Sequence, residues 1–114
     1  MLILHIVKIN EWETAVVTGI YCPASLETEG FIHCSTLEQV LTPANERFLG
    51  QEGLALLSIE PEKVAAPIVY EDCYDSGQTF PHIYGPLNVN AVTAVIPFPP
   101  QANGRFLLPE GLLQ

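Results

Sequence analysis

Apolar and polar positions alternate over residues 2–9, where His5 lies among leucine, isoleucine and valine. A two-residue period predicts a β-strand, here a buried strand that carries one polar side chain. Five other short apolar or alternating runs predict further strands. These runs cover residues 30–35, 54–59, 67–71, 91–98 and 106–108. The run at 54–59 is the most apolar, which favours a central position in the sheet.

A first helix follows the first strand. Asn10 has the residue type of a helix cap, and Glu13 stands three positions later, where its carboxylate can answer the cap's backbone N–H. Gly19 is a natural C-terminal stop. We therefore expect a short helix over residues 11–18.

A second helical region follows the strand at 30–35. Ser35 and Thr36 are each followed three positions later by glutamate or glutamine, which predicts a helix over residues 36–41. Pro43 is tolerated as the first residue of a helix, so a further helical piece is expected from there to Leu49.

The order of these elements sets the fold class. Residues 21–29 and 72–79 lack periodicity and are expected to be loops, and Asn103 with Gly104 predicts a turn. About six strands and two or three short helices in mixed order predict an α+β fold. The length fits one domain, over residues 1–114.

The charge balance excludes one class of partner. Thirteen acidic residues face four basic ones, for a net charge of −9. Binding to a nucleic-acid polymer rests on several lysine or arginine contacts with phosphates, and this chain cannot supply them. A small ligand with one or two phosphates remains compatible, since one arginine and a few backbone N–H groups can hold it.

Cysteines and apolar runs indicate the compartment. The three cysteines, Cys22, Cys34 and Cys73, are an odd number without zinc-site spacing, so we expect reduced, mostly buried thiols in a cytoplasmic protein. No apolar run approaches the length of a membrane span, and the N-terminal residues lack a basic leader. We therefore expect neither membrane insertion nor a signal peptide.

All three histidines lie on predicted strands or strand ends, each beside a large apolar residue. A single histidine in such a place is more often a satisfied structural residue. Three of three favour convergence on one polar cleft, formed by His5, His33 and His82. Imidazole acts as a general acid or base near neutral pH and donates to ribose or phosphate oxygens.

Ser35 and Thr36 open the predicted helix at 36–41, where free N–H groups and the helix dipole favour an anion. Capping alone explains the same two residues equally well. Tyr84 stands two positions after His82 and has a ring suited to stacking.

Other catalytic arrangements fit less well. None of the serines lies in a nucleophile-elbow turn. Cys34 follows His33 directly, and neighbours in an extended strand point to opposite faces, so the two cannot form a dyad. A three-histidine metal site is possible in principle, but long-range histidine spacing is a weak signal. We expect no bound metal.

Two blocks of the chain, residues 29–36 (EGFIHCST) and 80–87 (FPHIYGPL), resemble the signature blocks of the bacterial "domain of unknown function 952" family. The resemblance extends to the strand of His5, to Trp12 and to Gly104, and covers nearly the whole chain.

The family has no established activity, and its fold resembles the ADP-ribosyltransferase type. This resemblance implies a bent, split, mixed β-sheet with an NAD cleft between its halves. It implies that His5, His33 with Ser35, and His82 occupy three successive positions in that cleft. ADP-ribosylating relatives carry a glutamate in the third position, and Glu71 would replace it if it folds toward the cleft.

The leading hypothesis is therefore a cleft for NAD or a related small nucleotide. His33 and His82 are the candidate catalytic residues, for ADP-ribosyl transfer or NAD processing. The rival hypothesis is a non-catalytic domain that binds a metabolite or a protein partner. The residues expected to contact the ligand come from three segments: His5, His33, Ser35, Thr36, His82 and Tyr84.

The charge argument gives a first prediction. At physiological salt, the protein should show no measurable binding to RNA or DNA duplexes in a fluorescence-anisotropy titration, because its acids repel the polyanion. Micromolar binding that weakens steeply with added salt would contradict this expectation.

Overall fold

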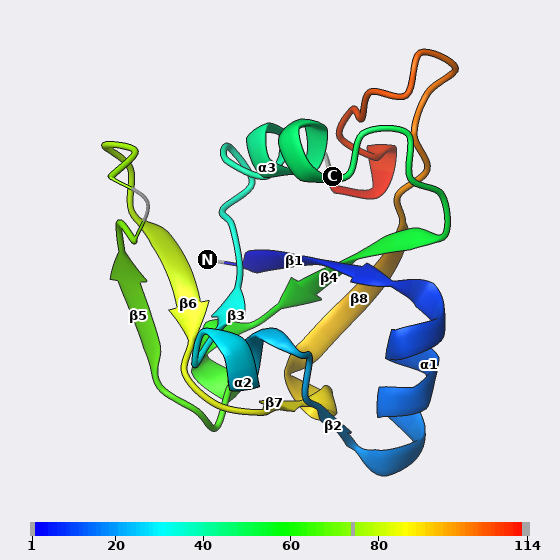
Figure 1. Cartoon of the computed structure of the whole chain (residues 1–114). Coiled ribbons are helices and arrows are strands. Elements are labelled where there is room, and N and C mark those ends of the chain that lie inside the picture. Colours follow the sequence, from blue (N-terminus) through cyan, green and yellow to red (C-terminus); the bar gives the residue numbers. More distant parts are fainter. Residues whose placement is uncertain (1, 74, 113–114) are drawn as a thin grey trace.

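The computed structural model describes residues 2–73 and 75–112, and its central element is strand β4 (Leu54–Ile59). This strand pairs antiparallel with β1 (Ile3–Lys8) on one side and β8 (Val92–Pro97) on the other. All six residues of β4 are buried. The apolar run therefore occupies the central position that its composition predicts (Figure 1).

A second antiparallel sheet has the order β3 (Ile32–His33), β6 (Phe80–Ile83), β5 (Ile68–Glu71). A backbone bridge joins it to the first sheet, where Leu4 and Ser35 exchange two hydrogen bonds of 2.7 and 2.8 Å. We call this bridge the seam.

A third sheet contains only β2 (Ile20–Tyr21) and β7 (Leu87–Asn88). The α-helices are α1 (Ile9–Thr18), α2 (Ser25–Thr28) and α3 (Leu41–Arg47). Single 3₁₀ turns cover Pro61–Lys63, Val89–Ala91 and Glu110–Leu112. None of the helices in the described residues is long and apolar enough to cross a membrane.

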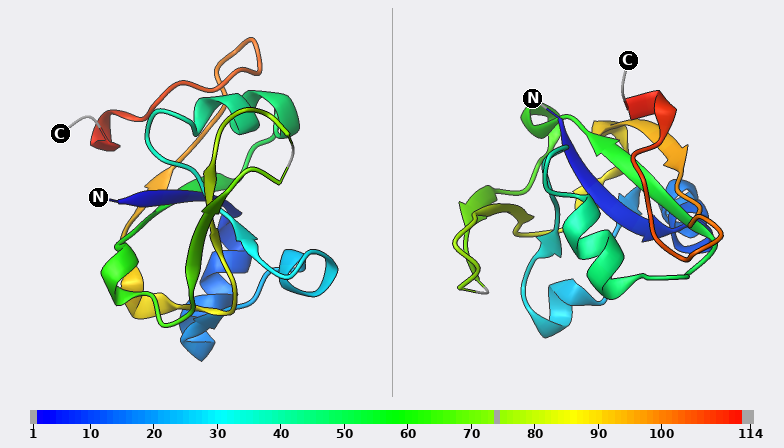
Figure 2. Two further views of the ribbon diagram at one scale, coloured as in Figure 1. Left: turned by 90° about the vertical axis from the view of Figure 1, so that its left-hand side faces the viewer. Right: turned by 90° about the horizontal axis from the view of Figure 1, so that it is seen from above.

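Both faces of the β1–β4–β8 sheet are covered, because side chains alternate along each strand. Ala55, Leu57 and Ile59 join a core with Trp12 of α1. Leu54 and Leu56 face the opposite way. They pack with Val40, Ala44, Phe98 and Phe106, from α3, the turn before it and the C-terminal segment. In Figures 1 and 2, α1 and α3 accordingly lie on opposite sides of this sheet.

The α+β class is confirmed, and the mixed sheet is wrong: every strand pair in the described residues is antiparallel, in three small sheets. The expected strand at 106–108 is also absent. Phe106 instead donates its N–H to Asn45 Oδ1 at 2.7 Å and accepts from Asn45 Nδ2. A side chain of α3 thus takes the place of a neighbouring strand.

The start of the first helix differs from the prediction. Helix α1 begins at Ile9, and neither Asn10 nor another side chain caps it. The N–H of Ile9 donates to the carbonyl of Gly53 at 2.8 Å, so the β1–β4 ladder continues into the helix and sets its first residue. The predicted stop is confirmed, since Gly19 is left-handed with φ 85°.

The helix predicted at 36–41 is absent. Ser35 uses both backbone groups in the seam and is held extended, so it cannot open a helix there. Gln39 still accepts from the Thr36 N–H at 3.1 Å, as the capping pattern requires, but it closes only a turn. Helix α3 begins at Leu41 and accommodates Pro43 in its first turn, where no N–H is needed.

The segment at 21–29, expected to be a loop, contains the last residue of β2 and the one-turn helix α2. Both elements are too short to show a period in the sequence. The loop over residues 72–79 is confirmed for the positions that the structure describes, which exclude residue 74.

Gly85 gives a test of the packing beside β6. Its φ is +155°, and a Cβ built on it would lie 2.9 Å from the Cβ of Ala66. We expect Gly85→Ala to lower the free energy of unfolding by about 1–3 kcal/mol, measured by urea denaturation. Adding Ala66→Gly should recover part of this loss, since it removes the clash but not the backbone strain. Strictly additive effects of the two substitutions would contradict the contact.

Candidate functional site

The side chain of His5, on β1, forms hydrogen bonds with residues of β2 and β3 next to the candidate site. Its Nδ1 lies 2.6 Å from the carbonyl oxygen of His33, and its Nε2 lies 2.9 Å from the hydroxyl of Tyr21. A carbonyl only accepts, so Nδ1 carries the proton and Nε2 accepts from Tyr21. Both ring nitrogens of His5 are therefore engaged by the protein itself.

The ring of His5 is neutral at physiological pH. Burial lowers its pKa from 6.5 to about 4, against the opposing effect of the hydrogen bond to His33. The pKa of Tyr21 is raised, chiefly by burial and then by the charge of Glu11, so its hydroxyl keeps its proton. This pair orders β1, β2 and β3 relative to one another.

His33 and His82 stand opposite each other in the β3–β6 register. Their ring centroids are 5.6 Å apart with an edge-to-face orientation. Phe31 stacks on His82 at 4.0 Å and 17°, and also contacts the ring of His33. The sequence places Phe31 and His33 two positions apart, on the same side of an extended chain.

Each of these two imidazoles contacts a carboxylate. His33 Nε2 lies 2.8 Å from Glu29 Oε2, and His82 Nδ1 lies 2.9 Å from Glu71 Oε2. Tyr84 donates its hydroxyl to the same oxygen of Glu71. The Tyr84 bond and then the His82 bond lower the pKa of Glu71, and the bond to Glu71 raises the pKa of Tyr84 to about 12. Carboxylates in these positions orient an imidazole for proton transfer or ligand binding.

Two hollows adjoin His33. The inner hollow, of about 190 Å³, is lined by His82 and by polar residues of α3 and of the loop after β5. The middle hollow, of about 240 Å³, is lined by His5 and Tyr21. Residues shared by both walls are His33, Ser35, Pro43 and Arg47.

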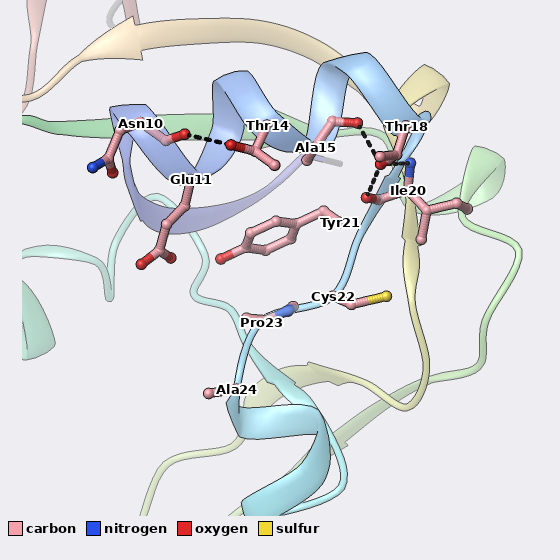
Figure 3. A pocket seen from close by; sticks show the side chains of 10 residues that line it. All are labelled: Asn10, Glu11, Thr14, Ala15, Thr18, Ile20, Tyr21, Cys22, Pro23 and Ala24. Carbon is pink, nitrogen blue, oxygen red and sulfur yellow. Dashed lines mark hydrogen bonds between the residues drawn. The ribbon is translucent and has the colours of Figure 1, made fainter.

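A third, outer hollow of about 690 Å³ lies along α1 and β2 (Figure 3). It shares Glu11, Tyr21 and Pro23 with the middle hollow. Each hollow therefore shares wall residues with the next, and we call the three together the groove.

The predicted site residues fall into three groups, according to the hollow that they line. His33, Ser35 and His82 share the inner hollow, while His5 lines the adjoining middle one. Thr36 and Tyr84 line neither. Thr36 bonds Gln39 in a turn, and the helix start expected to bind an anion there does not form. The ring of Tyr84 lies 5.3 Å from that of Phe31 and its hydroxyl contacts Glu71.

The three cysteines are free, as expected, but the expectation of mostly buried thiols is wrong. Cys22 and Cys73 are exposed, and Cys34 is buried. Cys34 is buried in the core that contains Trp12, and burial raises the pKa of its thiol. It therefore forms no dyad with the neighbouring imidazole.

Several site residues were missed from the sequence. Arg47 lines two hollows, and its rarity as one of four basic residues was the available signal. Glu29 lies four residues before His33, but the chain from one to the other is not a continuous helix, so this spacing alone did not predict their contact. Glu71, expected only as a substitute for a missing acid, does fold onto His82.

Comparisons with known proteins give the relatives of this chain. Residues 6–95 match the family model described as "Protein of unknown function (DUF952)". The crystal structure of protein CC0527 from Caulobacter crescentus is similar over 100% of both chains, with 34% identity and a TM-score of 0.89. The solution NMR structure of the same protein covers 91% of this chain and 90% of that chain, with 35% identity and a TM-score of 0.79. No match was found among the curated proteins.

The neutral state of His5 predicts a pH dependence. The unfolded chain binds a proton near pH 6.5 and the folded chain only near pH 4, so stability falls as pH decreases through this window. The loss attributable to His5 is up to about 3 kcal/mol. We expect a His5→Asn variant, which keeps a donor toward His33, to show a correspondingly flatter profile in urea denaturation from pH 7.5 to 4. Parallel profiles for the two proteins would contradict this assignment.

Proposed function

Because this chain belongs to the DUF952 family of proteins of unknown function, its own site must indicate what it does, and we propose that its groove binds a small phosphorylated ligand of the nucleotide class. NAD is the first candidate. The observation that carries this proposal is the grouping of Arg47, His33 and His82 on one hollow of a protein that has only four basic residues.

The chemistry of the inner hollow suits a phosphate or pyrophosphate. Arg47 offers a guanidinium, which binds phosphate oxygens in pairs. His33 and Ser35 add hydrogen-bonding groups to the wall shared with the middle hollow. Glu46 lines the same hollow and the net charge is −9, so anion binding here rests on Arg47 and the imidazoles and not on the overall charge.

The rest of the groove suits the remaining parts of a nucleotide. The inner and middle hollows together fall within the usual size of small-molecule sites. Glu11 and Tyr21, between the middle and outer hollows, offer an acceptor and a hydroxyl for ribose or amide groups. An elongated ligand therefore fits this groove better than a compact anion does.

ADP-ribosyl transfer is the reaction we propose for NAD in this groove. It breaks the bond between the nicotinamide nitrogen and ribose C1′ and forms a bond from an acceptor oxygen to the same carbon. Nicotinamide leaves with the bonding pair, and the Glu71–His82 pair takes the acceptor's proton. Two sheets joined by backbone bonds at the seam support the ADP-ribosyltransferase-like, split-sheet part of this proposal.

A second candidate function is binding without catalysis. It is favoured by the burial of His82, which is 1% exposed and stacked on Phe31. A ring held so firmly is as well suited to form a rigid wall of a binding site as to transfer a proton. Both candidates require the ligand in the groove, and only the first requires its cleavage.

The test is calorimetric titration of the full chain with NAD, ADP-ribose and inorganic phosphate. We expect binding of NAD or ADP-ribose to weaken by tenfold or more in Arg47→Gln, the effect of about 1.5–3 kcal/mol for a charge-assisted hydrogen bond. Arg105→Gln is the matched control, since it removes the same charge from an exposed residue outside the groove.

Three outcomes discriminate. Failure of the unaltered protein to bind any of the three ligands would overturn the proposal. Equal losses in the Arg47 and Arg105 variants would assign the binding to general electrostatics. Release of nicotinamide from NAD, followed by NMR and lost in His82→Gln, separates catalysis from binding alone.

A further inference from the structure

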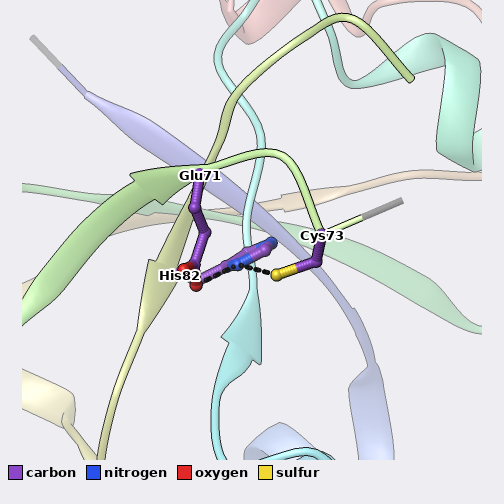
Figure 4. A group of neighbouring side chains, drawn as sticks. All are labelled: Glu71, Cys73 and His82. Carbon is purple, nitrogen blue, oxygen red and sulfur yellow. Dashed lines mark hydrogen bonds and ion pairs between the residues drawn. The ribbon is translucent and has the colours of Figure 1, made fainter. Parts of the chain in front are cut away.

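Glu71, Cys73 and His82 meet at the base of the loop over residues 72–79 (Figure 4). His82 Nδ1 lies 2.9 Å from Glu71 Oε2 and 3.7 Å from Cys73 Sγ. One oxygen, one nitrogen and one sulfur atom from these three residues all lie within 4.8 Å of one another. Two of these residues flank the β5 end of the loop, and the third comes from β6.

We propose that Glu71, Cys73 and His82 form a binding site for one divalent transition-metal ion of the zinc class. This site is distinct from the three-histidine arrangement considered from the sequence, because it uses a thiol and a carboxylate from the loop side of His82. It goes beyond the proposed function, since binding of a nucleotide in the groove does not require the ion. A bound ion takes up Glu71 and His82 Nδ1, the pair that accepts the proton in the proposed transfer, so that reaction belongs to the metal-free chain.

The spacing of the donor atoms fits a tetrahedral ion. Zinc bonds of about 2.0–2.3 Å place neighbouring ligand atoms about 3.3–3.6 Å apart. The contacts of His82 Nδ1 at 2.9 and 3.7 Å bracket that range. A small movement of the Glu71 and Cys73 side chains, of which Cys73 is exposed, is enough to close the site.

The donor set selects the class of ion. Thiolate and imidazole favour zinc and related transition metals, whereas magnesium and calcium favour oxygen ligands alone. Among the three ligands, His82 is the fixed point, because its ring is almost wholly buried and stacked on Phe31. A rigid first ligand lowers the ordering cost of binding the ion.

The surrounding charges favour a cation. The carboxylates of Glu71, Asp72 and Glu29 act electrostatically on the Cys73 thiol. The same carboxylates attract a divalent ion, which displaces the thiol proton when it binds. A metal on three protein ligands keeps one position open for water or another small ligand.

A bound ion would also connect the loop to the strands on either side of it. The loop already folds back on Asp72, whose carboxylate accepts from the N–H groups of Ser76 and Gly77. Joining Cys73 to His82 adds a cross-link between the loop and β6. An ion that binds the folded chain alone raises the free energy of unfolding, and with it the unfolding temperature, with the logarithm of its concentration relative to Kd.

The experiment is a titration of the metal-free full chain, kept reduced, with Zn²⁺ and with Co²⁺ as its spectroscopic substitute. We expect one equivalent to bind, with a thiolate-to-cobalt absorption band and a rise in unfolding temperature. Mg²⁺ at the same concentrations should produce neither change. None of these measurements uses a nucleotide, so their failure is distinguishable from failure of the proposed function.

Variants locate the site. Cys73→Ser should weaken Zn²⁺ binding by about 100-fold or more, since removal of a ligand costs at least as much as removal of a ligand's hydrogen-bond partner. It should also abolish the cobalt–thiolate band. Cys22→Ser, which removes another exposed thiol, is the matched control and should leave both readouts unchanged.

A second variant tests the carboxylate ligand. Glu71→Gln should also weaken Zn²⁺ binding while keeping the thiolate band at saturating Co²⁺, since it removes a different ligand. Absence of stoichiometric Zn²⁺ binding in the unaltered chain would overturn the proposal. So would affinity that survives Cys73→Ser, or a cobalt band lost equally in the Cys22 control.

Discussion

The structure depends on the seam, where Leu4 and Ser35 exchange backbone hydrogen bonds between the two three-stranded sheets. The side chain of His5 reinforces it from the adjacent position by donating to the carbonyl of His33. These bonds lie in a partly buried place, where unpaired backbone groups would be costly. They fix the β1–β4–β8 sheet against β3, and so they fix where His33 stands.

Hydrogen-bonding side chains line the groove on either side of the seam. Residues on either side of it must satisfy hydrogen bonds, and the chain supplies histidines, carboxylates and Tyr21 for that purpose. In His5, both ring nitrogens already have hydrogen-bond partners within the protein. His33 is positioned by a backbone bond at its carbonyl and by Glu29 at its ring, and it forms part of two hollows at once.

The parts of this fold that the sequence predicts are those governed by local pattern. The apolar run of β4, the period of β1 and the left-handed Gly19 follow from local sterics and burial. What failed depended on distant partners. Ser35 has the sequence of a helix cap but is drawn into the seam by Leu4, and Phe106 is held by Asn45 instead of a strand. For the site, the histidines could be identified by type, whereas Glu29 and Arg47 are brought there only by tertiary structure.

The position of β4 has a consequence for how the chain reaches this structure. Its partners are the first and the last strand of the described residues, so the central sheet joins two strands that lie far apart in the sequence. During synthesis, β1 and β4 can pair well before β8 emerges, which leaves one edge of β4 open until Val92–Pro97 arrives. Such non-local pairing requires large loops to close first, so we expect slower folding than for a helical bundle of the same length. The nascent chain therefore carries a temporarily unpaired apolar strand edge, the kind of surface that molecular chaperones cover.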